Sequence, residues 1–364
     1  MADFKTPTSK RIQSRLENNS SEYQTPLKIP ATPYLKQIGY GCGVNVFTLE
    51  RSPRVGFARS PWAIKKRNAK IIKDKKFDKR IQLEADILRQ LKHENIVGFR
   101  ALTLSETGVP CLAMEQLEIS LGDLIEKRLE EDGGPFPAKN IEHVGFEVAK
   151  GLEYLHHTVL ILHGDLKSYN VLVSNNLKIV KLCDFGVSVP LNEQLELDNS
   201  KNDFSYTGTE CWNAPEIISD EGPVTNKTDM WAYGLTLWEM IALLPPHVDD
   251  ESLNESNMDV SMDENSILSS ENTDSNGTMM DDSLLMLDEK SSCKYGTRPP
   301  LPAIEFGSEY DRVLEVFYLC TDQDYRTRPS AKGVVMYFKS FIKETSESKV
   351  TTSDKSKSTL DDKA

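Results

Sequence analysis

The pattern of apolar and polar positions divides the chain into a strand-rich first part and a helix-rich second part. Short runs at 44–49, 62–64 and 111–114 have strand character, and residues 77–91 have helical spacing with apolar positions on one broad face. Beyond about residue 120, helical spacing recurs at 121–130, 138–157, 229–243, 309–320 and 330–343. Strands followed by helices predict an α+β chain with two unequal lobes.

Three polar segments interrupt or flank this pattern. Residues 1–33 and 344–364 are rich in polar residues and are predicted to be disordered tails. Residues 247–293 are rich in Ser, Asn, Asp and Glu without periodicity, which predicts a disordered insertion in a surface loop. The expected folded domain therefore spans 34–343, with a small lobe at 34–117 and a larger lobe at 118–343.

The net charge of −13 is local to the insertion. Between His247 and Glu289 there are thirteen acidic residues and no Lys or Arg, and without those thirteen the remaining 43 acidic residues balance the 43 basic ones. We therefore expect no direct binding to duplex nucleic acid. No apolar run is long enough to span a membrane, so no membrane association is expected. The six cysteines form no Cys-x-x-Cys pair, which indicates free thiols in a reducing compartment.

A glycine-rich hairpin and a strand-end lysine are the first signs of phosphate chemistry. The hairpin Gly39-Tyr40-Gly41-Cys42-Gly43 would let the backbone approach a polyphosphate, although such a hairpin is usually only a turn. Lys65 ends an apolar strand, where a solvent-exposed lysine is the ordinary alternative. Glu84 on the following helix would supply the carboxylate that a buried lysine needs.

The segment from His163 to Asn170, followed by Cys183-Asp184-Phe185-Gly186, is the strongest signal in the chain. Phosphoryl transfer from ATP to a hydroxyl needs a carboxylate at the hydroxyl, a cation at the γ-phosphate and oxygen ligands for Mg²⁺. Asp165, Lys167, Asn170 and Asp184 are residues of those types, and a chance match to every fixed position is very improbable. The sequence therefore predicts a phosphotransferase that uses ATP and Mg²⁺.

These motifs resemble those of the eukaryotic protein kinases over about residues 38–343. The resemblance implies a bilobal fold with a β-rich N-lobe and an α-helical C-lobe. It implies that Lys65 binds the α- and β-phosphates and pairs with Glu84, while Asp165 is the catalytic base. It further implies that Lys167 contacts the γ-phosphate. Asn170 and Asp184 would be the Mg²⁺ ligands.

The same resemblance assigns the nucleotide and substrate sites. The ATP-binding residues it implies are Ile38, Gly39, Tyr40, Gly41, Cys42, Gly43, Val44, Asn45, Val46, Ala63, Lys65, Met114, Glu115, Leu117 and Leu172. Met114 would be the gatekeeper, and Thr209 would help to seat the substrate. Asp229 and a Glu216–Arg328 pair would be scaffold. Lys167 and Thr209 resemble the Ser/Thr type, with dual specificity left open.

Further motifs, among them Gly41-Cys42-Gly43-Val44 and Gly296-Thr297-Arg298-Pro299-Pro300, resemble a mitotic kinase of the MAP-kinase-kinase-like group. This resemblance implies a role in cell division, a cytoplasmic and nuclear location, and protein substrates such as MAP kinases or histones. Thr6 and Thr25 each precede a proline, which predicts phosphorylation by an upstream proline-directed kinase. The last three residues lack the ending that PDZ domains capture, so a PDZ partner is not expected.

Three positions depart from the family pattern. Val44 replaces the third glycine of the hairpin, and Gly164 replaces an arginine that would pair with an activation-loop phosphate. We therefore expect phosphorylation of that loop to be a weak switch. Trp212 replaces a tyrosine, for which only a change in packing is expected.

Two alternatives to a protein kinase stay open from sequence. One is a pseudokinase scaffold that binds nucleotide and partners without phosphotransfer. The other is a small-molecule kinase of similar fold. The intact acidic and basic residues argue against the first, and the substrate-seating segment at 208–216 argues against the second.

Overall fold

The computed structural model describes residues 35–41, 43–51, 60–68, 76–105, 108–200, 204–247 and 295–341. Both predicted tails, nearly all of the predicted insertion, Cys42, Thr6 and Thr25 lie outside the described residues. The chain divides into two compact units. The first runs through Glu118 and also contains Lys181–Val187, and the second contains Ile119–Val180 and the chain from Ser188 onward.

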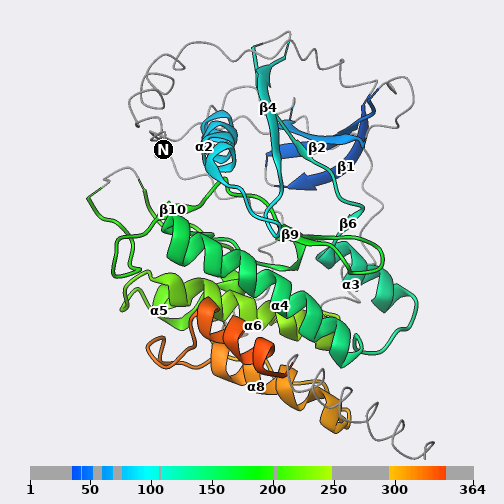
Figure 1. Ribbon diagram of the computed structural model, residues 1–364, viewed down its shortest axis with the longest axis vertical. Coiled ribbons are helices and arrows are strands. Elements are labelled where there is room, and N and C mark those ends of the chain that lie inside the picture. The colour runs from blue at the N-terminus through cyan, green and yellow to red at the C-terminus, as the bar shows by residue number, and fades with distance from the viewer. Residues whose placement is uncertain are drawn as a thin grey trace, which may run out of the picture. The chain divides into compact units, whose positions relative to one another are not determined.

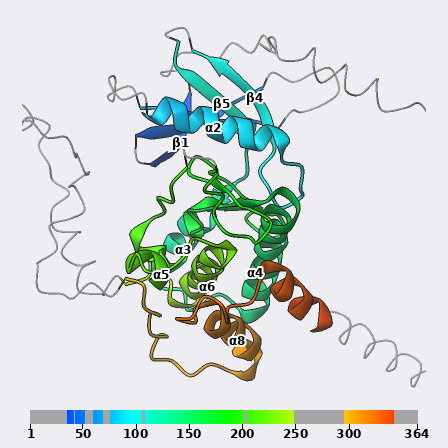
Figure 2. The ribbon, with the colours of Figure 1, turned by 90° about the vertical axis from the view of Figure 1, so that its left-hand side faces the viewer.

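The first unit is built on an antiparallel five-stranded sheet in the order β1-β2-β3-β5-β4. Its strands are β1 (Lys36–Gly41), β2 (Val44–Leu49), β3 (Trp62–Arg67), β4 (Phe99–Leu104) and β5 (Pro110–Glu115). Helix α2 (Lys76–Gln90) packs against β3, β4 and β5 (Figure 2). The sheet contributes a core of Leu49, Ile64, Ala101, Cys111 and Ala113.

Helix α2 shows how a charged side chain comes to lie on an apolar face. The helix buries Ile81, Ala85 and Leu88 at the three- and four-residue spacing that places side chains on one side of a helix. Glu84 lies on the same side and is 1% exposed. A carboxylate in that position requires a compensating cation, because an unpaired buried charge is very costly.

The second unit is mainly helical. Its helices are α3 (Leu121–Glu130), α4 (Ala138–Tyr154), α5 (Pro215–Ile218), α6 (Asn226–Ala242), α8 (Asp311–Cys320) and a last one at 331–341. A π-helical turn, η2 (Leu155–Val159), continues α4. Helices α4, α6 and α8 pack against one another, as both views show (Figures 1 and 2). Among the described helices, none combines the length and apolar character needed to cross a membrane.

Short strands and turns connect these helices and carry the polar motifs. The strands are β6 (Ile119–Ser120), β7 (Ile161–Leu162), β8 (Val171–Val173), β9 (Val180–Leu182) and β10 (Val189–Pro190). β6 pairs with β8 and β7 pairs with β10, each antiparallel. Two 3₁₀ turns, η3 (Ser168–Asn170) and η4 (Glu210–Trp212), lie in the motif segments.

Helix α6 forms the centre of the second unit. Its side chains are buried almost continuously from Asn226 to Ile241. Thr225 and Thr228 form a capping box, which starts the helix three residues earlier than the sequence pattern predicted. The helix ends where Leu243 adopts a left-handed conformation with φ 59°.

Two aromatic rings meet at the two residues that flank 248–294, a stretch outside the described residues. His247 and Tyr295 lie edge to face with ring centroids 5.8 Å apart. After Tyr295 the chain is fixed by Arg298, which donates hydrogen bonds to the Thr321 hydroxyl and to the carbonyl oxygens of Tyr318 and Thr321. The described chain therefore stops at His247 and resumes at Tyr295 at neighbouring points.

Candidate active site

The first unit gathers one cation and two carboxylates. Lys65 Nζ lies 2.8 Å from Glu84 Oε2 and 2.7 Å from Asp184 Oδ1. The Lys65 and Glu84 side chains are 8% and 1% exposed, whereas that of Asp184 is 38% exposed. Burial alone would lower the pKa of Lys65, but the charges of Asp184 and Glu84 outweigh it and raise the pKa, so the ammonium stays charged.

Glu84 responds to the same surroundings in the opposite sense. Burial raises the pKa of Glu84 to about 7, although Lys65 opposes the shift. The carboxyl group therefore exchanges its proton close to neutral pH while Lys65 remains a cation.

Backbone hydrogen bonds place Asp184 in the first unit, whereas the sequence analysis had assigned it to the larger lobe. The Val97 N–H donates to the Leu182 carbonyl, and the Leu182 N–H donates to the Asn95 carbonyl. Lys181 Nζ also lies 3.1 Å from Glu115 Oε2. These bonds tie the strand before Asp184 to the first unit. They pair residues far apart in sequence, which the sequence pattern does not show.

The glycine hairpin has a packing requirement as well as an expected phosphate role. Gly43 has φ +74°, and a Cβ there would lie 2.3 Å from the Phe77 ring of α2. Val44 begins β2 and pairs with Gly41 and Arg67 in regular antiparallel register. Because Val44 is extended, the valine that replaces the family glycine is accommodated without strain.

The other predicted nucleotide-binding residues fall on both units. In the first unit, Ala63 and Met114 are paired on β3 and β5, and they are 6% and 5% exposed. Ile38 is 42% exposed. Leu172 lies on β8 in the second unit, opposite Ser120. Each position is compatible with the predicted role, which stays a prediction.

The second unit brings three of the predicted residues together around Asp165. The Thr209 hydroxyl donates to Asp165 Oδ1 at 2.5 Å, and Lys167 Nζ lies 3.1 Å from Asp165 Oδ2. Lys167 Nζ also donates to Thr209 Oγ1 at 2.7 Å. Asn170 Nδ2 donates to the Asp165 carbonyl at 2.7 Å and to its Oδ2 at 3.0 Å. A carboxylate, an ammonium, a hydroxyl and an amide thus converge in one hydrogen-bonded group.

Asp229 of α6 holds the loop that carries Asp165. Its carboxylate accepts hydrogen bonds from the N–H groups of His163 and Gly164 at 2.8 and 3.0 Å, and His156 Nε2 lies 2.7 Å away. Burial opposes ionisation, but the hydrogen bond and charge of His156 outweigh it and lower the pKa of Asp229. Gly164 has φ 80°, a conformation that glycine adopts without strain. This agrees with the scaffold role that the family resemblance implied for Asp229.

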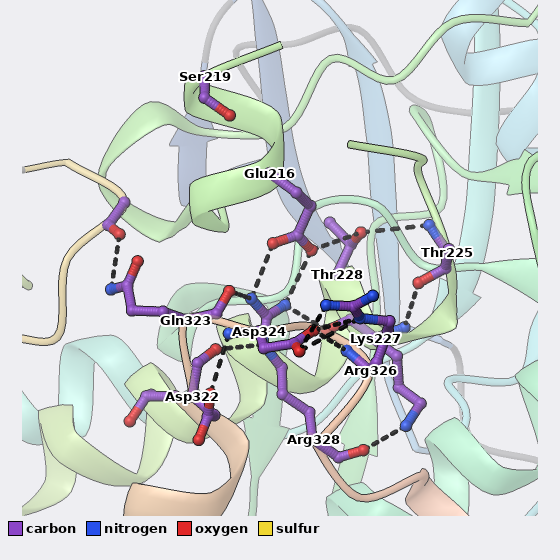
Figure 3. Close-up of polar contacts among 12 residues, drawn as sticks. Glu216, Ser219, Thr225, Lys227, Thr228, Asp322, Gln323, Asp324, Arg326 and Arg328 are labelled. Carbon is purple, nitrogen blue, oxygen red and sulfur yellow. Dashed lines mark hydrogen bonds and ion pairs between the residues drawn. The ribbon is translucent and has the colours of Figure 1, made fainter. Parts of the chain in front are cut away.

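Glu216 and Arg328 form a second scaffold pair, and Figure 3 shows their polar contacts. Arg328 NH1 and NH2 donate to the two carboxylate oxygens of Glu216 at 2.8 and 2.7 Å, in a bidentate arrangement. Arg328 also donates to the carbonyl oxygens of Asp322 and Lys227. The two side chains are 0% and 5% exposed, so the pair is structural.

The sequence analysis missed Glu239 and the hydrogen bond that Trp212 donates to it. Trp212 Nε1 donates to Glu239 Oε2 at 3.0 Å. The expectation that tryptophan in place of tyrosine changes only the packing stays a prediction. Burial raises the pKa of Glu239 to about 7, against the pull of the hydrogen bonds from Ser168 and Trp212. The sequence signal that could have indicated Glu239 was a single glutamate within the apolar stretch 235–241.

Asn170 and Asp184 are the predicted metal ligands, and each carries an oxygen donor of the type that Mg²⁺ prefers. Among the described residues, no group of three or more His, Cys, Asp and Glu side chains is placed to hold a metal. Mg²⁺ is usually bound by one or two protein oxygens together with water and phosphate oxygens. Asp184 offers a partly exposed carboxylate, and the Asn170 amide is oriented by two hydrogen bonds from its nitrogen. Each of these residues therefore offers, within its own unit, an oxygen donor of the type that such an ion takes.

Comparison with known proteins identifies relatives along almost the whole chain. The Protein kinase domain family matches residues 34–337. The human lymphokine-activated killer T-cell-originated protein kinase is 40% identical over 340 residues, which cover 92% of this chain and 97% of the relative. Mitogen-activated protein kinase kinase kinase 13-B of Xenopus laevis is 38% identical over 175 residues, covering 48% of this chain and 17% of that protein.

A third relative shows the same partial coverage. Mitogen-activated protein kinase kinase kinase 12 of Rattus norvegicus is 36% identical over 171 residues, and the match spans 18% of its length. The resemblance and the α+β fold predicted from the sequence are both confirmed. Protein kinases in general use ATP and a divalent metal ion. The chain therefore belongs to the protein kinase domain family.

Proposed function

We propose that this chain is an active Ser/Thr protein kinase that transfers the γ-phosphate of ATP to hydroxyl groups of proteins. The observation that supports this proposal best is the group formed by Asp165, Lys167, Asn170 and Thr209. Its members are linked by hydrogen bonds and ion pairs of 2.5–3.1 Å. A general base must lie within hydrogen-bonding reach of a hydroxyl, and Asp165 already accepts a hydrogen bond from one.

In this proposal the side chains divide the work of the reaction. Asp165 orients the incoming hydroxyl and accepts its proton. In this structure the same carboxylate accepts a hydrogen bond from the Thr209 hydroxyl. Lys167 supplies a positive charge beside that carboxylate, and Lys65 supplies one for the nucleotide phosphates. Asn170 and Asp184 would hold Mg²⁺, which neutralises phosphate charge when bound.

The Lys167–Thr209 hydrogen bond supports Ser/Thr specificity, because both residues match the Ser/Thr type of the family. Dual specificity is the alternative, and phosphoamino-acid analysis of a labelled substrate distinguishes the two. Phosphotyrosine beside phosphoserine or phosphothreonine would show dual specificity.

The biological setting is also a proposal. The resemblance of motifs supports a role in mitotic signalling in the cytoplasm and nucleus, with MAP kinases or histones as substrates. Thr6-Pro7 and Thr25-Pro26 support control by an upstream proline-directed kinase.

The decisive experiment compares wild type with Asp165→Asn in a radiolabelled Mg·ATP assay on a generic basic protein. Loss of a positioned base is expected to lower the rate about 10²–10⁴-fold, equivalent to about 3–5 kcal/mol in the barrier. Asp132→Asn, at an exposed position, makes the same chemical change and should keep wild-type activity. Equal labelling by wild type and Asp165→Asn would instead indicate a pseudokinase.

A further inference from the structure

One face of the five-stranded sheet carries a polar contact that the predicted nucleotide-binding residues do not explain. Side chains alternate between the two faces along a strand, and residues directly opposite each other in an antiparallel pair share a face. Thr48, Ala63 and Met114 are paired in one row across β2, β3 and β5. Ala63 and Met114 are predicted nucleotide-binding residues, so Thr48 lies on the same face as they do. Thr48 is 8% exposed.

Gln116 reaches Thr48 from the end of β5. Gln116 Nε2 donates a hydrogen bond to Thr48 Oγ1 at 3.2 Å, and the two residues are 68 positions apart in sequence. Strand β3 lies between β2 and β5, and its residue in this row is Ala63. The alanine side chain is a single methyl group, which leaves the space that the longer Gln116 side chain needs to cross β3.

The other end of the Gln116 amide carries a cost. Gln116 Oε1 is buried, and no described residue donates a hydrogen bond to it. A buried acceptor without a donor destabilises the folded chain, and native proteins contain few such groups. Features that are unfavourable for stability are found most often where function requires them. The position of the Gln116 amide is therefore not explained by stability alone.

The hydrogen bond joins two segments that are both predicted to contact the nucleotide. Gln116 lies between Glu115 and Leu117, which are both predicted nucleotide-binding residues. Thr48 lies two residues after Val46, which is another of them and points to the same face of β2. The contact therefore sets the spacing between the end of β5 and β2 in the first unit.

We infer, on the basis of the proposed kinase function, that Gln116 and Thr48 are a positioning pair that holds the nucleotide-binding segments of the first unit at the spacing that ATP requires. The pair acts through its neighbours and takes no part in phosphotransfer. The ion pairs of Lys65 described above involve Glu84 and Asp184. Loss of the positioning pair therefore leaves the phosphate-binding cation in place.

The expected signature is a change in nucleotide affinity alone. Without the hydrogen bond, the Kd for Mg·ATP and the KM for ATP should both rise, while kcat and the KM for the protein substrate stay near their wild-type values. A hydrogen bond between neutral groups contributes enough to predict an increase of about 3–10-fold in the Kd. A pair with a purely structural role would change stability without this selective effect.

The test measures the Kd of Mg·ATP by calorimetry in matched threonine variants. Thr48→Val keeps the side-chain shape and removes the hydroxyl, so the Kd should rise. Thr48→Ser keeps the hydroxyl and should bind close to wild type. Thr103→Val is the matched control, because Thr103 on β4 pairs with Cys111, which belongs to the core on the other face of the sheet. It should bind Mg·ATP as wild type does.

A second variant removes the other partner. Gln116→Met keeps the length of the side chain and loses the amide, so it should raise the Kd in the same sense as Thr48→Val. Because the two side chains act through one contact, the double variant should be no weaker than the weaker single variant. Urea unfolding shows whether each variant is folded. If Thr48→Val does not fold, Gln116→Met and Thr48→Ser carry the test.

The outcomes separate this inference from the proposed function. Equal Kd values in wild type, Thr48→Val and Thr103→Val would overturn the positioning role and leave the kinase assignment intact. A Thr48→Ser variant as weak as Thr48→Val, or additive losses in the double variant, would also overturn it. Wild type that binds Mg·ATP and labels no protein would overturn the proposed kinase function, and the Kd values would still decide the role of the pair.

Discussion

Each unit of this kinase buries an ion pair, and the two pairs differ in how completely they are enclosed. In the second unit, Arg328 binds both oxygens of Glu216 and is further bonded to backbone carbonyls, with both side chains almost fully buried. In the first unit, Lys65 divides its charge between buried Glu84 and the partly exposed Asp184.

The difference shows how one type of interaction serves two purposes. A guanidinium whose donors are all directed at fixed acceptors has no capacity left for a ligand, and its planar geometry suits a rigid brace. An ammonium with one solvent-facing carboxylate can exchange part of its coordination for phosphate oxygens. The enclosed pair therefore maintains the fold, and the open cluster is suited to binding.

The largest expected effect tests the enclosed pair. Arg328→Met should lower the free energy of unfolding by about 3–5 kcal/mol, because it leaves the Glu216 carboxylate buried without its cation. Urea unfolding followed by circular dichroism measures this change. Arg326→Met is the control, since Arg326 pairs with Asp324 at the surface and should unfold close to wild type. Equal losses in both variants would contradict the comparison.

The next effect concerns the open cluster. Lys65→Met should lower kcat about 10²–10³-fold, as expected when one electrostatic contact to the reacting phosphates is removed. Its unfolding free energy should fall less than that of Arg328→Met, because Glu84 can take up a proton when the cation is lost. Parallel kinetics and urea unfolding of the two variants measure the contrast. A Lys65→Met protein as unstable as Arg328→Met would remove the distinction.

The smallest effect is a dependence of stability on pH. The pKa of Glu84 is raised in the folded protein to about 7, so the folded state binds this proton more tightly than the unfolded chain does. The contribution of Glu84 to stability is therefore greatest at acid pH and declines as the pH rises towards about 7.

Glu84→Gln removes this titration. Wild type should therefore lose stability relative to Glu84→Gln between pH 5 and pH 8, by about 1.4 kcal/mol for each unit that separates the folded and unfolded pKa values. Urea unfolding of both proteins at four pH values measures the trend. Parallel pH dependence would show that the cluster holds Glu84 ionised throughout.

The sequence predicted the helices well because their periodicity is local. The run 77–91 corresponds to α2 at Lys76–Gln90, and 121–130 coincides with α3. The pattern did not predict β1 or β4 as strands, since half-exposed edge strands have a weak apolar signal. It also extended the helix from 138 through a region where the chain adopts a π-helical turn.

The candidate site was predicted where residue types at fixed spacing define chemistry. Asp165, Lys167, Asn170 and Thr209 were all named from sequence, and the structure places them in one group. Glu239 and the bond from Trp212 could not be predicted, because Ser168 and Glu239 are 71 residues apart. A buried carboxylate and its donors meet only in the folded chain.

The contact between His247 and Tyr295 has a consequence for engineering. Ends that lie together are the geometric condition for splicing in a reporter domain or opening new termini by circular permutation. The Arg298 hydrogen bonds to Thr321 anchor the segment that follows Tyr295. This anchoring does not depend on the residues between His247 and Tyr295. This junction is therefore a natural place to attach a sensor or an affinity handle to the kinase, outside the helices and strands that the structure describes.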